Sequence, residues 1–237
     1  SPETIGEVFD LLQEIPDAVA WVGLYLPDPE DLQEVADLFG LHELAVEDAI
    51  RAHQRSKLEH YGDTIFVVLR AALYLDETEE IEFGELHIFR GKNFVITVRH
   101  GRSPDLAVVF HRMEADPQML ALGTEGIAYS ILDTVVDGYA PVLEGLATDV
   151  AEIEDQVFMS SPGVSRRIYE LSQEIVEFHD AVRPLRAIVA GLAESFGQHE
   201  VAEELHAYLR DVADHAARAL DRIEGFRVTL RDVLALN

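Results

Sequence analysis

Carboxylates are the groups in this sequence that are best suited to chemistry. Glu47 and Asp48 are adjacent, and Asp133 and Asp137 are spaced i,i+4 in a helical pattern, where like charges repel by about 0.2–0.5 kcal/mol. Asp232 lies near the end of a long helical pattern. Hard divalent cations prefer carboxylate oxygens, and Mg²⁺ usually binds one or two of them while keeping several waters. These five residues are therefore candidate metal ligands, whereas most of the 45 acidic residues are expected to be ordinary exposed side chains.

Histidine-based and catalytic sites have weaker support. Glu203 and His206 form one i,i+3 pair of the kind that di-iron bundles use, but such sites need two pairs. His199, His206 and His215 are separated by 7 and 9 residues, so they do not share one tight helix face. The sequence has no P-loop, G-x-S-x-G or H-E-x-x-H motif. We therefore predict that the chain is not an enzyme, and we interpret residues 91–93 as a turn rather than a phosphate loop.

Charge is the most unusual property of the composition. The 237 residues include 45 acidic and 18 basic side chains, for a formal net charge of −27. A chain this acidic repels nucleic-acid backbones and anionic lipids and attracts cations. Because there is no cysteine, disulfides, thiolate metal sites and cysteine nucleophiles are excluded. The hydrophobic content of 48% is sufficient for a sizeable core.

No segment of the sequence is predicted to cross a membrane. The longest stretches without Asp, Glu, Lys or Arg are residues 18–27 and 156–165, ten residues each, whereas a spanning helix needs roughly 18–20 apolar residues. The N-terminus begins with Ser1 rather than methionine and has no recognisable signal peptide. We expect further sequence beyond both ends.

The first half of the chain combines short strands with short helices. Continuous or alternating apolar runs predict strands, and apolar residues at helical spacing predict helices. In the last of these helices, Ser103 is the expected N-cap and Pro104 the first helical residue. The pattern predicts an α+β domain over residues 1–123, an α/β/α sandwich with a mostly antiparallel sheet. The predicted strands are 20–26, 64–69, 82–89 and 94–98, and the predicted helices are 30–39, 43–50 and 103–113.

The second half, residues 124–237, contains only helical patterns and is the predicted second domain. Pro141 and Pro184 lie inside these patterns, and each is expected to kink its helix rather than break it, because the apolar spacing continues through both. The predicted helices are 124–158, 165–196 and 200–237.

The last helix carries a heptad seam. Its apolar positions follow steps of 4-3-4-4-3-4-3-4-3, which indicates one stutter after Tyr208. At 1.5 Å per residue the helix spans about 55 Å. We predict a stalk that continues beyond Asn237. The seam residues are Val201, Leu205, Tyr208, Val212, Ala216, Ala219, Ile223, Phe226, Leu230 and Val233.

The run from His42 to Glu59, HELAVEDAIRAHQRSKLE, resembles the CorA family of divalent-cation transporters. The resemblance extends in order over essentially the whole chain. Ser56 departs from the proline usual in the family, and we expect this difference only to loosen a turn. Further matching segments are YGD at 61–63, IFVVLR at 65–70, GKNFVIT at 91–97, YSILD at 129–133, VRPLR at 182–186 and RDV at 231–233.

The resemblance implies a fold and an assembly. A CorA-like chain has an α/β/α cytoplasmic domain followed by long helices, the last of which runs into the membrane. The family forms homopentamers, and its pore helix and Gly-Met-Asn loop would lie beyond Asn237. This chain would then be the soluble domain on the cytoplasmic face of the inner membrane.

The resemblance also implies roles for the acids. In CorA-type channels Mg²⁺ binds between neighbouring cytoplasmic domains and holds the closed state. Glu47 and Asp48 of one subunit and Asp232 of its neighbour match the ligand positions, and Asp133 and Asp137 match a secondary site. Co²⁺ and Ni²⁺ are alternative cations.

Other functions remain open at this point. A zinc transporter domain of the ZntB kind shares the architecture, and the ten histidines would suit Zn²⁺. A soluble, acidic module that binds a coiled-coil partner would also explain the seam. A metal-dependent enzyme is the least supported of the three, because no base–nucleophile pair is present.

Overall fold

A computed structural model describes residues 4–102, 104–159, 162–196 and 202–236. Its centre is a five-stranded sheet in the order β1-β5-β4-β3-β2. β1 is parallel to β5, and the other neighbouring strands are antiparallel. The predicted α+β fold with a mostly antiparallel sheet is confirmed. The strands are β1 (Ala20–Tyr25), β2 (Lys57–Tyr61), β3 (Thr64–Leu75), β4 (Glu80–Arg90) and β5 (Phe94–His100).

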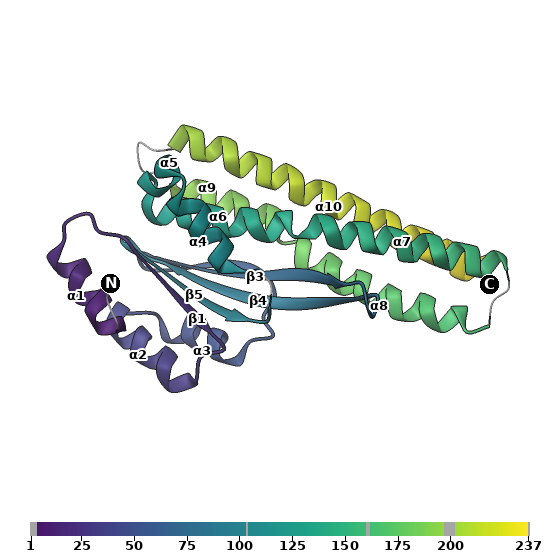
Figure 1. Cartoon of the computed structure of the whole chain (residues 1–237), viewed down its shortest axis with the longest axis horizontal. Helices are drawn as coiled ribbons and strands as arrows, with labels where there is room; N and C mark the ends of the chain where they lie inside the picture. The colour runs from purple at the N-terminus through teal and green to yellow at the C-terminus, as the bar shows by residue number, and fades with distance from the viewer. Residues whose placement is uncertain (1–3, 103, 160–161, 197–201, 237) are drawn as a thin grey trace.

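Three N-terminal helices cover one face of the sheet (Figure 1). Helical spacing in α2 buries Leu32 and Val35, which belong to one hydrophobic cluster with Phe66 of β3. α2 ends at Gly40, whose φ of 66° is a left-handed conformation that favours glycine. These helices are α1 (Ile5–Glu14), α2 (Pro29–Phe39) and α3 (Glu43–Arg51).

The opposite face is covered by the helices that follow β5. Side chains alternate across a strand, so Val67 and Leu69 of β3 face away from Phe66 and join the cluster formed with these later helices. The molecule thus has three layers, with the sheet in the middle. Whether residues 1–123 and 124–237 are separate domains stays a prediction. The helices are α4 (Leu106–Glu114), α5 (Pro117–Ala121), α6 (Gly123–Asp137), α7 (Tyr139–Phe158), α8 (Val164–Val182) and α9 (Leu185–Phe196).

The helical segments are interrupted near both internal prolines, at Gly138 just before Pro141 in α7 and at residues 183–184 between α8 and α9, so the prediction of continuous helices through them is wrong. Gly138 and Arg183 keep right-handed helical φ and ψ, so the backbone stays helical in conformation through each junction residue. A proline has no N–H for the carbonyl four residues earlier. Pro141 therefore leaves the carbonyl of Asp137 without its helical donor, and α6 ends at that residue. In the same way Pro184 cannot donate to Asp180, and α8 ends two residues later at Val182.

The start of α4 also differs from the prediction. The helix begins at Leu106, and Asp105 is its N-cap, accepting a hydrogen bond from the N–H of Ala107 at 3.0 Å. Pro104 therefore precedes the helix. Ser103, the expected cap, lies outside the described residues.

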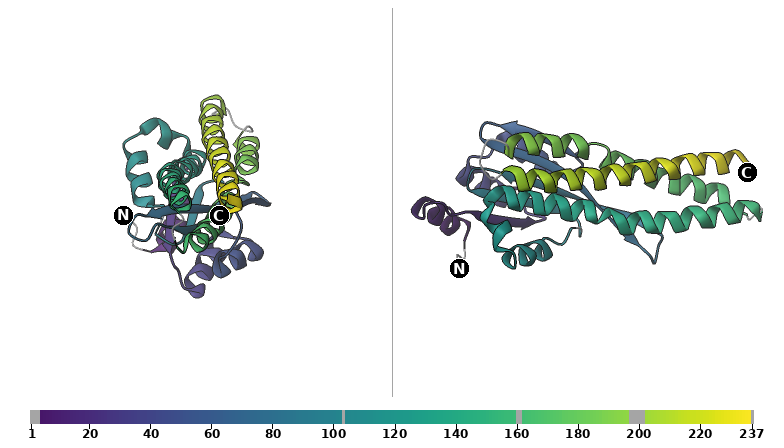
Figure 2. Two further views of the ribbon diagram at one scale, coloured as in Figure 1. Left: turned by 90° about the vertical axis from the view of Figure 1, so that its right-hand side faces the viewer. Right: turned by 90° about the horizontal axis from the view of Figure 1, so that it is seen from above.

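The last helix, α10 (Ala202–Leu236), has 35 residues and packs on α6, α7, α8 and α9 of the same chain. Figure 2 shows α7, α8 and α10 running together past the end of the sheet. The structure describes no helix that is both long and apolar enough to span a membrane.

The predicted stutter in the α10 seam is wrong. Leu209, not Tyr208, is the buried residue in that turn, so the steps from Leu205 onward alternate as 4-3 without interruption. Tyr208 instead stacks on Tyr129 of α6, with ring centroids 5.4 Å apart. Because helices of the same chain cover the seam, it does not present an open face to a partner helix. Val201, the first predicted seam residue, lies outside the described residues.

Candidate functional site

Helix α3 carries two of the predicted metal ligands, Glu47 and Asp48. The helix begins after His42, whose Nδ1 accepts a hydrogen bond from the N–H of Leu44 at 3.2 Å. Val46 and Ala49 are buried against the sheet. This leaves Glu47 exposed and Asp48 half-buried at the edge of the packed face.

Asp48 is paired with a lysine that the sequence analysis did not select. Lys57 Nζ, at the start of β2, lies 2.7 Å from Asp48 Oδ2 and 2.8 Å from Glu59 Oε2. The side chains of Asp48, Lys57 and Glu59 are 25%, 28% and 38% exposed. Burial lowers the pKa of Lys57, but the hydrogen bonds and charges of the two acids outweigh it, so the pKa lies above its usual value. We call these three residues the lysine cluster.

Glu47 points to a different partner from Asp48. Its carboxylate lies 2.6 Å from Arg51 Nη1, an i,i+4 pair on the same helix. Glu47 and Arg51 also line a shallow pocket between α2 and α3, together with Gln33 and Asp37 of α2. Although the two acids are adjacent in sequence, the structure does not bring them together on one cation.

The loop between α3 and β2 is held by a buried carboxylate of β4. Both oxygens of Glu85 accept the N–H of Gln54, at 3.0 and 3.2 Å. His87 Nε2 lies 2.6 Å from Glu85, while His87 Nδ1 is buried without a hydrogen-bond partner. Burial raises the pKa of Glu85, but the contact with His87 outweighs this and the pKa lies below its usual value. Glu85 therefore ties the loop that joins Asp48 to Lys57 to the middle of the sheet.

Two further features constrain this loop. Ala52 and His53 adopt φ values of 52° and 60°, a region that costs non-glycine residues energy and needs support from surrounding contacts. Ser56 is buried, and its hydroxyl donates a hydrogen bond to the carbonyl of Ala181 at 3.1 Å. The expectation that Ser56 merely loosens a turn is therefore wrong, because the residue fastens the loop to α8.

Asp133 and Asp137, the second predicted pair, lie on α6 and contact two different helices. Arg112 of α4 lies 3.3 Å from Asp133 Oδ2, and His215 Nδ1 of α10 lies 3.4 Å from Asp137 Oδ1. Burial and the neighbouring Asp137 raise the pKa of Asp133, while Arg112 and His215 oppose that effect. These two acids do not meet Glu47 or Asp48.

Asp232 lies on the outer side of α10. The flanking residues Leu230 and Val233 are buried in the seam, so Asp232 points outward, with a side chain 68% exposed and 3.6 Å from Arg231. Figure 1 shows that the end of α10 lies far from α3. Within one chain, therefore, Asp232 does not reach Asp48.

The structure brings together a second acidic cluster that sequence reasoning missed. One carboxylate oxygen each from Glu79, Asp149 and Glu152 lies within 4.8 Å of the others. Arg167 Nη2 lies 2.7 Å from Glu79, 2.8 Å from Glu152 and 3.8 Å from Asp149. We call these four residues the arginine cluster.

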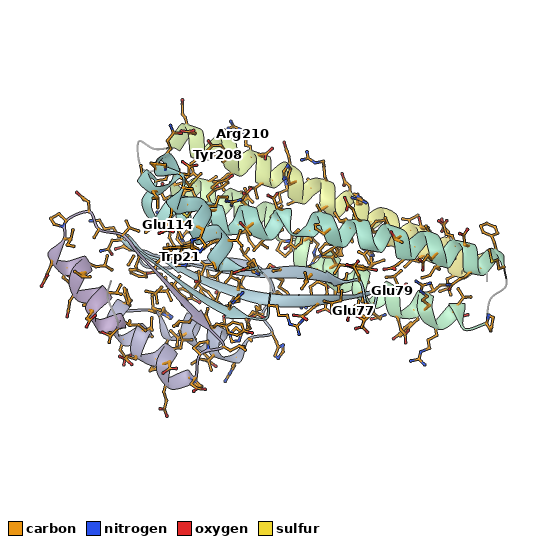
Figure 3. All side chains as sticks on the ribbon, viewed as in Figure 1. Trp21, Glu77, Glu79, Glu114, Tyr208 and Arg210 are labelled. Carbon is orange, nitrogen blue, oxygen red and sulfur yellow. The ribbon has the colours of Figure 1, made fainter. Side chains whose placement is uncertain are left out.

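The arginine cluster joins the β3–β4 turn to α7 and α8, and Figure 3 shows Glu79 at the tip of that turn. Asp149 is only 5% exposed and also accepts a hydrogen bond from the hydroxyl of Tyr74 at 2.9 Å. Glu79 and Arg167 are 88 residues apart, and no short motif in the sequence connects them.

The histidine candidates do not form a group. Glu203 is exposed and His206 half-buried, and neither belongs to the three-residue group of possible metal ligands found among the described residues. His215 contacts Asp211 at 3.6 Å in addition to Asp137. His199 lies outside the described residues.

The sequence is similar to a protein family and to several known proteins. The model of the "CorA-like Mg2+ transporter protein" family matches residues 16–236. YfjQ of Bacillus subtilis, whose name assigns it to metal ion transport, is 30% identical over 214 residues, covering 90% of this chain and 66% of the relative. The cobalt/magnesium transport protein CorA of Thermotoga maritima is 27% identical over 198 residues, covering 83% of this chain and 56% of the relative. The chain thus spans about two thirds or less of these relatives.

Solved structures share the fold. The soluble domain of CorA from Methanocaldococcus jannaschii superposes with a TM-score of 0.76 at 18% identity, covering 92% of this chain and 86% of that one. The ZntB cytoplasmic domain from Vibrio parahaemolyticus gives a TM-score of 0.68 at 14% identity, covering 90% and 84%. At these identities the likeness shows the fold alone.

Proposed function

Since this chain belongs to the CorA-like Mg²⁺ transporter family, we propose that it is the ion-sensing cytoplasmic domain of a divalent-cation transporter. The proposed cargo is Mg²⁺, with Co²⁺ and Ni²⁺ as alternatives. In this proposal divalent ions bind between subunits of a homopentamer at the cytoplasmic face of the membrane, and their binding favours the closed state.

The observation that carries the proposal is the position of Asp232 relative to Asp48. Asp232 is exposed near the end of α10, which lies far from α3 of the same chain (Figure 1), while Asp48 is partly exposed on α3. An ion that uses both carboxylates would therefore need Asp232 from a neighbouring copy. Glu47 would be a further ligand beside Asp48, and Asp133 and Asp137 would form a secondary site on α6.

The physical basis is charge. Subunits that each carry a net charge of −27 repel one another when acidic faces meet. A divalent ion held by two carboxylates replaces that repulsion with attraction, because both subunits then bind one cation. Occupancy of the site shifts the equilibrium toward the state in which the two faces are close. Loss of the ion at low Mg²⁺ concentration would release them.

The proposal can be tested on the 237-residue chain. We expect millimolar MgCl₂ to increase self-association in light scattering and to raise the melting temperature relative to the chain in EDTA. Asp48→Ala and Asp232→Ala should each lose the effect. Asp221→Ala, which removes an exposed acid from the same helix as Asp232, is the matched control and should keep it. Equal loss in all three variants would contradict the proposal, because it would show a general effect of charge.

A zinc-transporting relative is the second candidate, and His215 favours it. Its imidazole lies beside Asp137 and Asp211, and Zn²⁺ prefers imidazole nitrogen more strongly than Mg²⁺ does. Calorimetry with ZnCl₂ and MgCl₂ would separate the two. Binding of Zn²⁺ that His215→Ala abolishes, with no response to Mg²⁺, would support the zinc-transporting alternative.

A further inference from the structure

We propose that Lys57 is a tethered cation that occupies Asp48 in the ion-free chain and leaves it for Glu59 when a divalent ion binds. This inference rests on the proposed function of Asp48 as an ion ligand and adds how the site is regulated. Lys57 would set the Mg²⁺ concentration at which the site fills, because the ion must displace it.

The geometry places one ammonium between two carboxylates. Lys57 and Glu59 are two residues apart on β2, so their side chains lie on the same face of the strand. Their partners on β3, Val68 and Phe66, are both buried under the α1–α3 layer. Lys57 therefore points toward α3, where it meets Asp48 at 2.7 Å while it contacts Glu59 at 2.8 Å.

A divalent ion can displace Lys57 because lysine binds carboxylates as a point charge. An ammonium on a flexible stem makes single hydrogen bonds and can change partners, unlike the planar, forked guanidinium of arginine. Glu59 already contacts Lys57 and also accepts a hydrogen bond from the hydroxyl of Tyr61 at 3.1 Å, so it is fixed in place as the second acceptor. Lys57 can release Asp48 without losing its last carboxylate.

Competition follows from the positions of the two cations. Mg²⁺ binds oxygen at about 2.1 Å, so an inner-sphere ion on the Asp48 carboxylate lies close to the Lys57 ammonium. The two positive charges repel each other at this distance. The two acids raise the pKa of Lys57, so its charge persists throughout the neutral pH range. Displacing Lys57 from Asp48 therefore costs free energy, and this cost weakens the binding of the ion.

The chain offers a matched control for this inference. It contains two lysines, Lys57 and Lys92. Lys92 lies exposed in the turn between β4 and β5. Replacing either lysine removes the same unit of charge, but only Lys57 contacts Asp48. A general effect of net charge would therefore be equal in the two variants.

The test is a titration of the chain and its variants with MgCl₂, followed by melting temperature and light scattering. We expect Lys57→Met to lower the MgCl₂ concentration at the midpoint by up to about fivefold. Lys92→Met should leave the midpoint unchanged. Lys57→Arg should raise it, because a forked guanidinium holds the two acids more firmly. Opposite shifts for the methionine and arginine variants could not come from local unfolding.

Three outcomes would contradict the inference in different ways. A wild-type response with an unchanged midpoint in Lys57→Met would overturn the role of Lys57 and leave the proposed function intact. Equal shifts in Lys57→Met and Lys92→Met would show a general effect of charge and overturn it as well. No response to MgCl₂ in any of the proteins would overturn the proposed function and this inference together.

Discussion

The lysine cluster and the arginine cluster both hold acids around one internal cation, but they differ in burial and in the chemistry of that cation. In the lysine cluster every member is at least a quarter exposed. In the arginine cluster Asp149 is 5% exposed and Arg167 contacts three acids from two other elements. The first contains the adaptable point charge of lysine and the second the rigid fork of arginine.

The difference in burial indicates which carboxylates can bind an ion from solution. A buried carboxylate without its partner is an uncompensated charge in a poorly solvated site. Arg167 therefore cannot move away from Asp149 without destabilising the fold. A partly exposed carboxylate can exchange one cation for another because water covers it during the exchange. We therefore interpret the arginine cluster as a structural joint between the β3–β4 turn and the helices, although its three acids have metal-ligand spacing.

The largest expected effect comes from removing the arginine. We expect Arg167→Met to lower the free energy of unfolding by about 2–3 kcal/mol, because it leaves Asp149 buried beside two other acids without their cation. Urea denaturation measures this change. Arg166→Met is the control, since Arg166 is exposed and pairs with Glu170 on the same helix, a contact between solvated side chains that contributes little to stability. Similar losses in both variants would contradict the structural role of the arginine cluster.

A smaller effect should follow from disturbing the tyrosine that binds Asp149. A Cβ added at Gly145 would lie 2.6 Å from the ring of Tyr74. We expect Gly145→Ala to cost about 1–2 kcal/mol, because the ring must move and its hydrogen bond to Asp149 is lost. Gly225→Ala, in α10 with open space around the added Cβ, should instead stabilise the chain by up to about 1 kcal/mol. Thermal denaturation measures the stability of both variants. A Gly145→Ala variant as stable as the wild type would contradict the role of the contact between Tyr74 and Asp149.

The smallest expected effect is a pH dependence of stability that arises from Glu174, near Asp149 of the arginine cluster. Burial raises the pKa of Glu174 to about 7, and the charges of Glu80, Asp149 and Glu177 add to it. Between its ordinary value of 4.5 and 7, the folded chain holds a proton that the unfolded chain has released. Stability therefore falls as pH rises through this range.

Replacing Glu174 tests that dependence. Glu174→Gln keeps an acceptor for the N–H of Ile81, which lies 3.1 Å away, and removes the titration. At pH 8 we expect it to exceed the wild type in stability by up to about 1 kcal/mol, a figure reduced for solvent exposure. At pH 4.5 the two should be equal. Glu194→Gln, an exposed acid on α9, should follow the wild-type profile, and denaturation at several pH values would reveal any departure.

Several elements could be predicted from periodicity alone. Continuous apolar runs predicted β1, β3 and β5, the alternation of residues 82–89 predicted β4, and helical spacing predicted α2 and α3. The prediction missed β2, whose sequence KLEHY is charged because it lies at the edge of the sheet. It also missed the short helix α5, which has five residues. The expectation that the chain is not an enzyme is confirmed by its membership in a transporter family.

Where the sequence was ambiguous, tertiary packing made the choice. Tyr208 and Leu209 are adjacent apolar residues, and either could continue the seam of α10. The bundle buries Leu209 and places Tyr208 against Tyr129, because a uniform 4-3 spacing keeps one face of the helix against its neighbours.

By itself, the sequence determined the acidic character, the α+β pattern and the run from His42 to Glu59 that indicates the family, since these depend on residue type and local spacing. Only the tertiary structure decided which acids already hold a cation. Lys57 reaches Asp48 through a loop fastened by Glu85 and Ser56, and Arg167 meets Glu79 across 88 residues. Such pairings depend on how separate elements pack, because charges interact through space rather than along the chain.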